Sequence, residues 1–160
     1  MINFKRGIQI IKGCDLKIAS STTMTEVEQK AAAYILESSV INGYKHVKLI
    51  CNTGLNFESE NYLWLCSHGD GEIFSVQIHS IQHNISKPEE RAKIAVNCRK
   101  WLLKHGQISL NAIYNWGRIG YVEDIDWHYF VGIGITFRCL ETKQLFEQLE
   151  KTKCLLFFPR

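Results

Sequence analysis

The residues best suited to chemistry occur as four closely spaced pairs. These are His79 with His83, Cys66 with His68, Asp126 with His128, and Glu58 with Glu60. Two histidines four residues apart on a helix would lie on one face as zinc ligands. His79 and His83 instead fall in or just after an expected strand, where that spacing separates two residues by about 13 Å. There is also no Cys-x-x-Cys motif and no third ligand nearby, so the sequence predicts no metal site.

Cys66 and His68 would share one face of a strand, an arrangement in which an imidazole can activate a thiolate nucleophile. Cys66 ends an apolar run that begins at Leu63, which favours a packed thiol instead. Asp126 and His128 have the same spacing and are an acid–base candidate of the kind that hydrolases and nucleases use. Such a pair is equally typical of exposed polar residues at the start of a strand.

The carboxylates Glu58 and Glu60 flank a serine in an expected loop, where both would be solvated. The glycines form neither a P-loop nor a Gly-x-Gly-x-x-Gly motif, so no nucleotide site is predicted. We therefore expect no cofactor, and the chain carries no specific catalytic signature.

The segment 114–130 holds six aromatic residues in 17 positions. Residues 115–118 are expected to form a turn that presents Trp116 and Arg118, and Trp, Tyr and Arg dominate the free energy of many interfaces. Three carboxylates nearby would add an acidic rim. The sequence predicts a partner-binding surface made of Tyr114, Trp116, Arg118, Glu123, Asp124 and Asp126. The alternative is that the rings are core, which we favour for Trp127 and Tyr129.

Charge is distributed unevenly along a chain whose net charge is only +3. Residues 49–86 contain four acidic residues and no Lys or Arg, whereas residues 87–105 contain six basic residues and two acidic ones. Lys93, Lys100 and Lys104 recur at helical spacing opposite Trp101, which makes them a second candidate surface, for an acidic protein or a phosphate backbone. An ordinary solvated helix face would show the same pattern.

Three helices are expected to position these residues. Thr23 and Glu26 form a capping box that opens a helix running to about Ile41, where Asn42-Gly43 would end it. A second capping box, Ser86 with Glu89, opens a helix that runs to His105 and stops at Gly106. A third helix is expected over residues 140–151.

Strands with alternating or continuous apolar residues are expected between these helices. They cover residues 2–11, 14–20, 47–51, 62–67, 72–81, 108–114, 119–122, 127–137 and 154–158. The order is ββα-βββα-βββα, with a possible final strand. Because single strands and helices do not alternate, the sequence predicts an α+β fold with largely antiparallel sheets, in one domain over residues 1–160.

Composition excludes several classes of protein. A chain of 160 residues that is 46% hydrophobic, with two prolines, has enough apolar side chain for a folded core. The six cysteines are far apart and are expected to be reduced thiols. No secretory segment or membrane span is recognisable, so we expect a cytoplasmic protein without a membrane partner.

Three functions are compatible with this sequence. We favour a protein-binding domain without catalysis, because such a domain needs no signature beyond its surface; in this it resembles bacterial immunity proteins, which neutralise a toxin by tight occlusion. The first alternative is a small hydrolase-like or nuclease-like enzyme that uses a His–carboxylate or Cys–His pair. The second is a single-stranded nucleic-acid-binding domain, with rings as stacking platforms and lysines along the phosphates.

Overall fold

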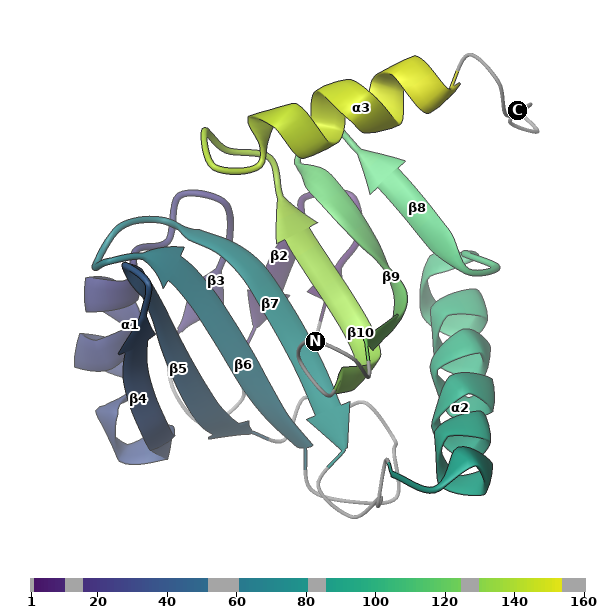
Figure 1. Ribbon diagram of the computed structural model, residues 1–160, viewed down its shortest axis with the longest axis horizontal. Coiled ribbons are helices and arrows are strands. Elements are labelled where there is room, and N and C mark those ends of the chain that lie inside the picture. Colours follow the sequence, from purple (N-terminus) through teal and green to yellow (C-terminus); the bar gives the residue numbers. More distant parts are fainter. Residues whose placement is uncertain (1, 11–15, 52–60, 81–85, 125–129, 154–160) are drawn as a thin grey trace.

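The structure, a computed structural model, describes residues 2–10, 16–51, 61–80, 86–124 and 130–153 (Figure 1). Along the chain the elements are β1 (Ile2–Asn3), β2 (Ile8–Ile10), β3 (Lys17–Ile18), α1 (Met24–Lys30), the 3-10 helix η1 (Ala32–Tyr34), β4 (Ile35–Ile41), β5 (Tyr44–Cys51), β6 (Asn61–His68), β7 (Ile73–Ser80), α2 (Pro88–Gly106), β8 (Asn111–Tyr114), β9 (Gly117–Asp124), β10 (Phe130–Phe137) and α3 (Lys143–Lys153). The predicted α+β class and its three groups of strands, each followed by a helix, are confirmed.

The main sheet has seven strands in the order β4-β5-β6-β7-β10-β9-β8, and every neighbouring pair is antiparallel. It consists of two meanders, β4–β7 and β8–β10, which meet where β10 pairs with β7. In that pairing Ile133 lies opposite Ile78 and Ile135 lies opposite Val76. A second, three-stranded sheet contains β1, β2 and β3.

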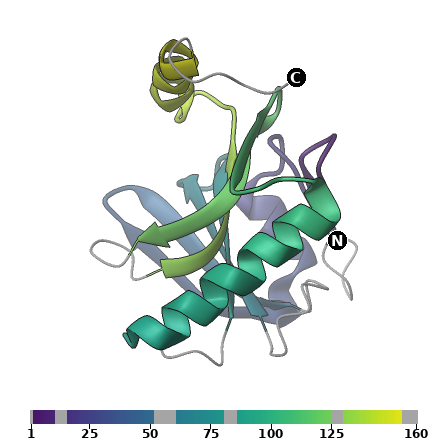
Figure 2. The ribbon, with the colours of Figure 1, turned by 90° about the vertical axis from the view of Figure 1, so that its right-hand side faces the viewer.

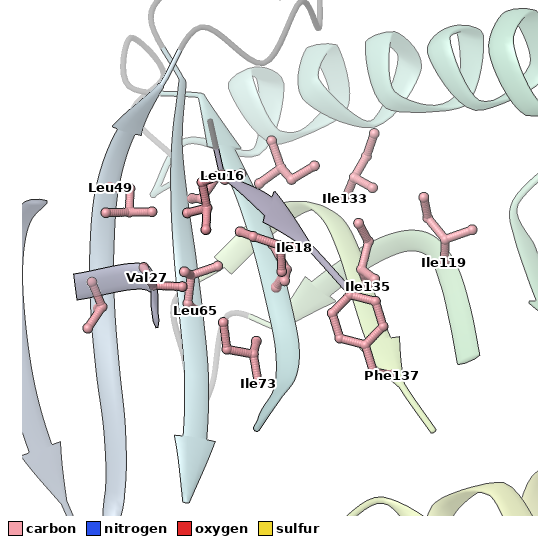
Figure 3. Close-up of a cluster of buried hydrophobic side chains, with 14 of the residues drawn as sticks. Leu16, Ile18, Val27, Leu49, Leu65, Ile73, Ile119, Ile133, Ile135 and Phe137 are labelled. Carbon is pink, nitrogen blue, oxygen red and sulfur yellow. The ribbon is translucent and has the colours of Figure 1, made fainter. Parts of the chain in front are cut away.

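One face of the main sheet forms the core. Alternate residues of its strands, such as Val47, Leu49, Leu63 and Leu65, are fully buried because side chains alternate between the two faces of a strand. Figure 3 shows sheet residues of this kind meeting Leu16, Ile18 and Val27 from the opposite layer. That layer contains α1 and the small sheet, which lie behind the main sheet in Figure 1.

No described helix or strand lies over the other face of the main sheet at β4–β7. In Figure 1 these four strands face the viewer, with no helix in front of them among the residues drawn as ribbon. Helix α2 packs against β9 and β10 and runs diagonally across the molecule in Figure 2, with α3 above the sheet. We call the uncovered side of β4–β7 the open face.

The first helix is shorter than predicted. Thr23 is its N-cap, as expected, and the Thr23 hydroxyl accepts a hydrogen bond from the Glu26 N–H at 3.2 Å. The helix ends at Lys30, however, and β4 occupies the region expected to be its second half. Asn42 and Gly43, with φ of 54° and 82°, form the two-residue turn of the β4–β5 hairpin rather than a helix exit.

The ends of α2 also differ from the prediction. Lys87 is the N-cap and Pro88 the first helical residue, so the capping box at Ser86 and Glu89 is wrong. At the C-terminal end Gln107 adopts the left-handed conformation, with φ of 55°. Gly106 stays helical, and a Cβ placed on it would lie 2.7 Å from Cε1 of Phe4. Its lack of a side chain therefore serves close packing.

The remaining strands follow the prediction with local differences. The expected strand 2–11 is interrupted by a turn over residues 4–7, and the strand expected over 108–114 begins at Asn111. The strand expected over 154–158 lies outside the described residues. None of the described helices combines the length and apolar character that a membrane span requires.

Candidate binding site on the open sheet face

The predicted aromatic loop is the β8–β9 hairpin, with Asn115 and Trp116 as its two turn residues. The Trp116 ring stacks on Tyr114, with 5.2 Å between centroids and 8° between planes. Its indole N–H donates a hydrogen bond to the Phe4 carbonyl oxygen at 2.8 Å. Gly7, with φ of +63°, lies directly against the ring. Trp116 is thus half-buried and anchors the N-terminal segment; its contact with a partner stays a prediction.

Other residues of this predicted surface lie along β9. Arg118 is half-buried, opposite Ile113 on β8 and Thr136 on β10. Glu123 accepts a hydrogen bond from the Tyr121 hydroxyl at 2.9 Å and lies 3.4 Å from Nε of Arg91 on α2. The acidic rim therefore has a local counter-charge at Glu123, which the sequence analysis did not find.

Several candidate residues cannot be placed. Asp124 is the last residue of β9, opposite Phe130, and the structure describes its backbone only. The other candidates, which lie outside the described residues, are Asp126, His128, His83, Glu58 and Glu60. The proposed acid–base pair of Asp126 with His128 therefore stays a prediction.

The basic stripe of Lys93, Lys100 and Lys104 is exposed on α2. It lies on the side of the helix away from the buried residues Ile94 and Cys98. Lys93 donates a hydrogen bond to Glu90 at 2.8 Å, and this bond raises the pKa of Lys93. Since α2 packs on β9 and β10, the stripe is separated from the open face.

The open face itself contains a hollow of about 500 Å³. Four strands contribute its lining residues, which are Ile41, His46, Trp64, Cys66, Phe74, Ser75 and Gln77. His46, Trp64 and Cys66 point into it because their neighbours along each strand are buried in the core. A β-bulge displaces the β6–β7 register after Cys66, and both Phe74 and Ser75 consequently reach the hollow.

Rings and imidazoles contact one another across this face. Trp64 lies edge-on to His46 at 6.2 Å and tilted against His79 at 5.9 Å. Tyr44 makes edge contacts with His68 at 5.8 Å and with Phe74 at 5.9 Å. These contacts form two groups of rings on β5, β6 and β7, one around Trp64 and one around Tyr44. His79 is only 6% exposed, and burial, assisted by nearby Lys48, lowers its pKa to about 3.

The thiol of Cys66 is close to an imidazole, although not to the predicted one. Its Sγ lies 3.9 Å from Nε2 of His46, because the β5–β6 register places these two residues opposite each other. His68 contacts Tyr44 instead, so the pairing of Cys66 with His68 is wrong. Burial raises the pKa of Cys66 to about 11, which keeps it a neutral thiol near pH 7.

The hollow combines apolar ring surfaces with a few polar groups. It offers aromatic faces and edges, with a hydroxyl from Ser75 and an amide from Gln77. The described part of the chain contains no group of three His, Cys, Asp or Glu side chains that could hold a metal ion. Sequence reasoning missed this site, because its residues come from four strands whose register only the folded sheet defines.

Comparison with known proteins adds no further constraint. No protein-family model matches the chain, and no curated protein or solved structure shows significant similarity to it. The geometry of the open face is therefore the basis for assigning a function.

Proposed function

We propose that the chain is a protein-binding domain without catalytic activity, and that it holds its partner on the open face. The observation that carries this proposal is a hollow lined by half-buried rings on the side of β4–β7 over which no described helix or strand lies. Large rings bury much area with few rotatable bonds, and they cluster in pockets at the centre of interfaces. Trp64 and Phe74 are placed to act in this way.

A protein fits this surface better than a nucleic acid does. Single-stranded nucleic acid requires rings together with a basic groove that follows the phosphates. Here the rings lie over β5–β7, whereas Lys93, Lys100 and Lys104 lie on α2. Lys48 does lie on the open face, but it is opposite the acidic Glu37 in the β4–β5 pairing.

Catalysis by a Cys–His pair is not favoured, even though Sγ of Cys66 lies 3.9 Å from Nε2 of His46. A nucleophilic cysteine needs a lowered pKa, and burial raises that of Cys66. Binding without turnover matches what an immunity-type protein does when it neutralises a toxin by occlusion. We include toxin neutralisation in the proposal as its most specific form.

The experiment is affinity capture from an extract of the source cell with the tagged chain, followed by mass spectrometry. Trp64→Ala removes the central ring, and Gln77→Arg fills the hollow with a long charged side chain. We expect each to weaken a specific partner by about 30-fold or more, the loss of about 2 kcal/mol that marks a hot spot. Leu140→Ala, at a position 83% exposed, is the matched control and should have no effect.

Two further variants locate the interface if the open face is not used. Lys93→Glu with Lys100→Glu and Lys104→Glu tests the α2 stripe, and Arg118→Ala tests the β8–β9 hairpin. Both should leave binding of the captured protein unchanged, with folding checked by circular dichroism. Loss of binding in either one, with full binding by Trp64→Ala and Gln77→Arg, would contradict the proposal.

A further inference from the structure

The outer edge of β4 has no neighbouring strand among the described residues. β4 is the first strand of the main sheet and pairs there with β5. Leu36, Val40 and Ile41 are 54%, 66% and 56% exposed. Edge strands normally carry Lys, Pro, charges or β-bulges that prevent pairing with another chain. In β4 such features are confined to the first half, where Glu37 and the irregularity between Ile35 and Glu37 lie; the residues from Ser38 to Ile41 have no charge and no Pro.

We propose that β4 pairs antiparallel with β4 of a second copy of this chain, about a two-fold axis at Ser38. The residues of β4 read Ile-Leu-Glu-Ser-Ser-Val-Ile, two apolar residues at each end and three polar ones between. A strand with this symmetry is complementary to itself in the antiparallel direction, which is what a two-fold interface requires. The pattern therefore selects a second copy as the occupant of the edge.

Charge favours one register of this pairing. With Ser38 opposite its own copy, Glu37 lies opposite Ser39, and Leu36 lies opposite Val40. A register centred on Glu37 would place two carboxylates directly opposite each other, which destabilises a strand pair. The irregularity in β4 lies between Ile35 and Glu37, at one end of the strand. Residues 37–39, which pair with one another about the proposed axis, lie beyond this irregularity and can form the centre of the interface.

The pairing would also join two binding surfaces. Ile41 belongs to β4 and lines the hollow. Directly opposite residues of antiparallel strands point to the same side of the sheet. The hollows of the two copies would consequently lie on the same side of one continuous sheet, next to the shared edge.

Sedimentation velocity over a wide concentration range tests this inference. We expect the wild-type chain to reach twice its monomer mass, with dissociation on dilution. Ser38→Lys brings two ammonium groups together at the axis and should weaken the dimer by at least tenfold. Ser109→Lys adds the same charge at another exposed serine and should dimerise like wild type. A wild-type chain that stays monomeric, or Ser38→Lys that dimerises equally well, would overturn the proposal.

Cysteine cross-linking tests the register. Directly opposite Cα atoms in an antiparallel pair are about 4.5–5.5 Å apart, a separation that a disulfide spans. Oxidised Ser38→Cys should give a covalent dimer on a non-reducing gel, and oxidised Ser109→Cys should match wild type. A dimer that Ser38→Cys does not trap would refute this edge pairing. Trp64→Ala should dimerise normally, because the edge does not depend on the partner site.

Discussion

His79 is a titratable side chain that the fold buries on the open face of the sheet. It lies on β7 beside Trp64 and is almost fully buried. Burial is the largest cause of its low pKa, with the charge of Lys48 as the second. The folded protein therefore keeps this imidazole neutral at pH values where the unfolded chain protonates it.

This difference predicts a pH-dependent stability. Between about pH 6.5 and pH 3 the unfolded chain binds a proton at His79 that the folded chain does not, so stability falls as pH falls. The loss is up to about 1.4 kcal/mol per pH unit, or about 2 kcal/mol between pH 6.5 and pH 5. His79→Gln has no titratable group at this position. Its free energy of unfolding, measured with urea, should therefore fall by about 2 kcal/mol less than that of the wild type between pH 6.5 and pH 5. Parallel pH curves for the two proteins would show that His79 is not the cause.

Residue spacing along the chain identifies candidate groups but not their partners. For Cys66 the sequence suggested His68 as the neighbouring imidazole and favoured a packed thiol, whereas the side chain is half-buried and lines the hollow. The imidazole is His46, which is 20 residues earlier in the chain, because the register of β5 against β6 places it opposite. Alternation within β6 is visible in the sequence, whereas the register between strands is not.

At the scale of elements, the most instructive difference is between the expected helix 23–41 and the observed α1, η1 and β4. Val27, Ala31, Tyr34 and Ile41 do fall on one helical stripe. Asn42-Gly43 supplies positive φ, which both a helix end and a two-residue hairpin require. Pairing with β5 decides between the two, and that pairing is a tertiary interaction. The other two helices, α2 and α3, begin and end within a few residues of their expected bounds, although the cap expected for α2 is wrong.

The C-terminal end of α2 gives an element-level prediction. The left-handed backbone conformation of Gln107 is unfavourable for a residue with a Cβ and is readily adopted by glycine. Gln107→Gly should therefore raise the free energy of unfolding by about 0.5–1 kcal/mol. Gly106→Ala is the matched control, because its Cβ would press on Phe4 and Ile108. It should not show the gain of about 1 kcal/mol that alanine normally brings to a helix. Urea denaturation measures both; a destabilised Gln107→Gly would contradict this account.

At the scale of the whole molecule, Trp116 connects parts that are distant in the sequence. Its N–H holds the Phe4 carbonyl oxygen, while the Phe4 ring contacts Trp101 of α2 at 5.7 Å. The turn after β1 is thus fixed to both the β8–β9 hairpin and α2. A surface loop rich in Trp and Arg is typical of a binding site, and here its Trp116 also joins the main sheet to the N-terminal segment.

We predict that Trp116→Phe lowers the free energy of unfolding by about 1 kcal/mol, the value of a typical hydrogen bond. Trp116→Ala should lower it by about 2–3 kcal/mol, since a half-buried ring is also lost. Amide hydrogen exchange in residues 2–10 should become faster in both variants. Leu140→Ala should change stability by less than about 0.5 kcal/mol. If Trp116→Ala is as stable as the wild type, the ring does not anchor the N-terminal segment.

The strand order explains why the candidate binding surfaces could be predicted only in part. The positive charge of residues 87–105 and the exposure of its lysines follow from helical spacing alone. Their separation from the rings of the open face depends on β10 lying between α2 and β7. The aromatic residues of segment 114–130, by contrast, were predicted to form a surface because they are close together in the chain.

The junction of the two meanders has a consequence for biosynthesis. Strands β4 to β7 pair with their sequence neighbours and can form as soon as they leave the ribosome. The remaining edge of β7 must wait for β10, which is translated only after α2, β8 and β9. Pairings between distant segments are slow to form, and unpaired edges in partly folded chains promote aggregation. Of the edges that become paired within one chain, that of β7 therefore waits longest for its partner, and this edge is where a chaperone would protect the nascent chain.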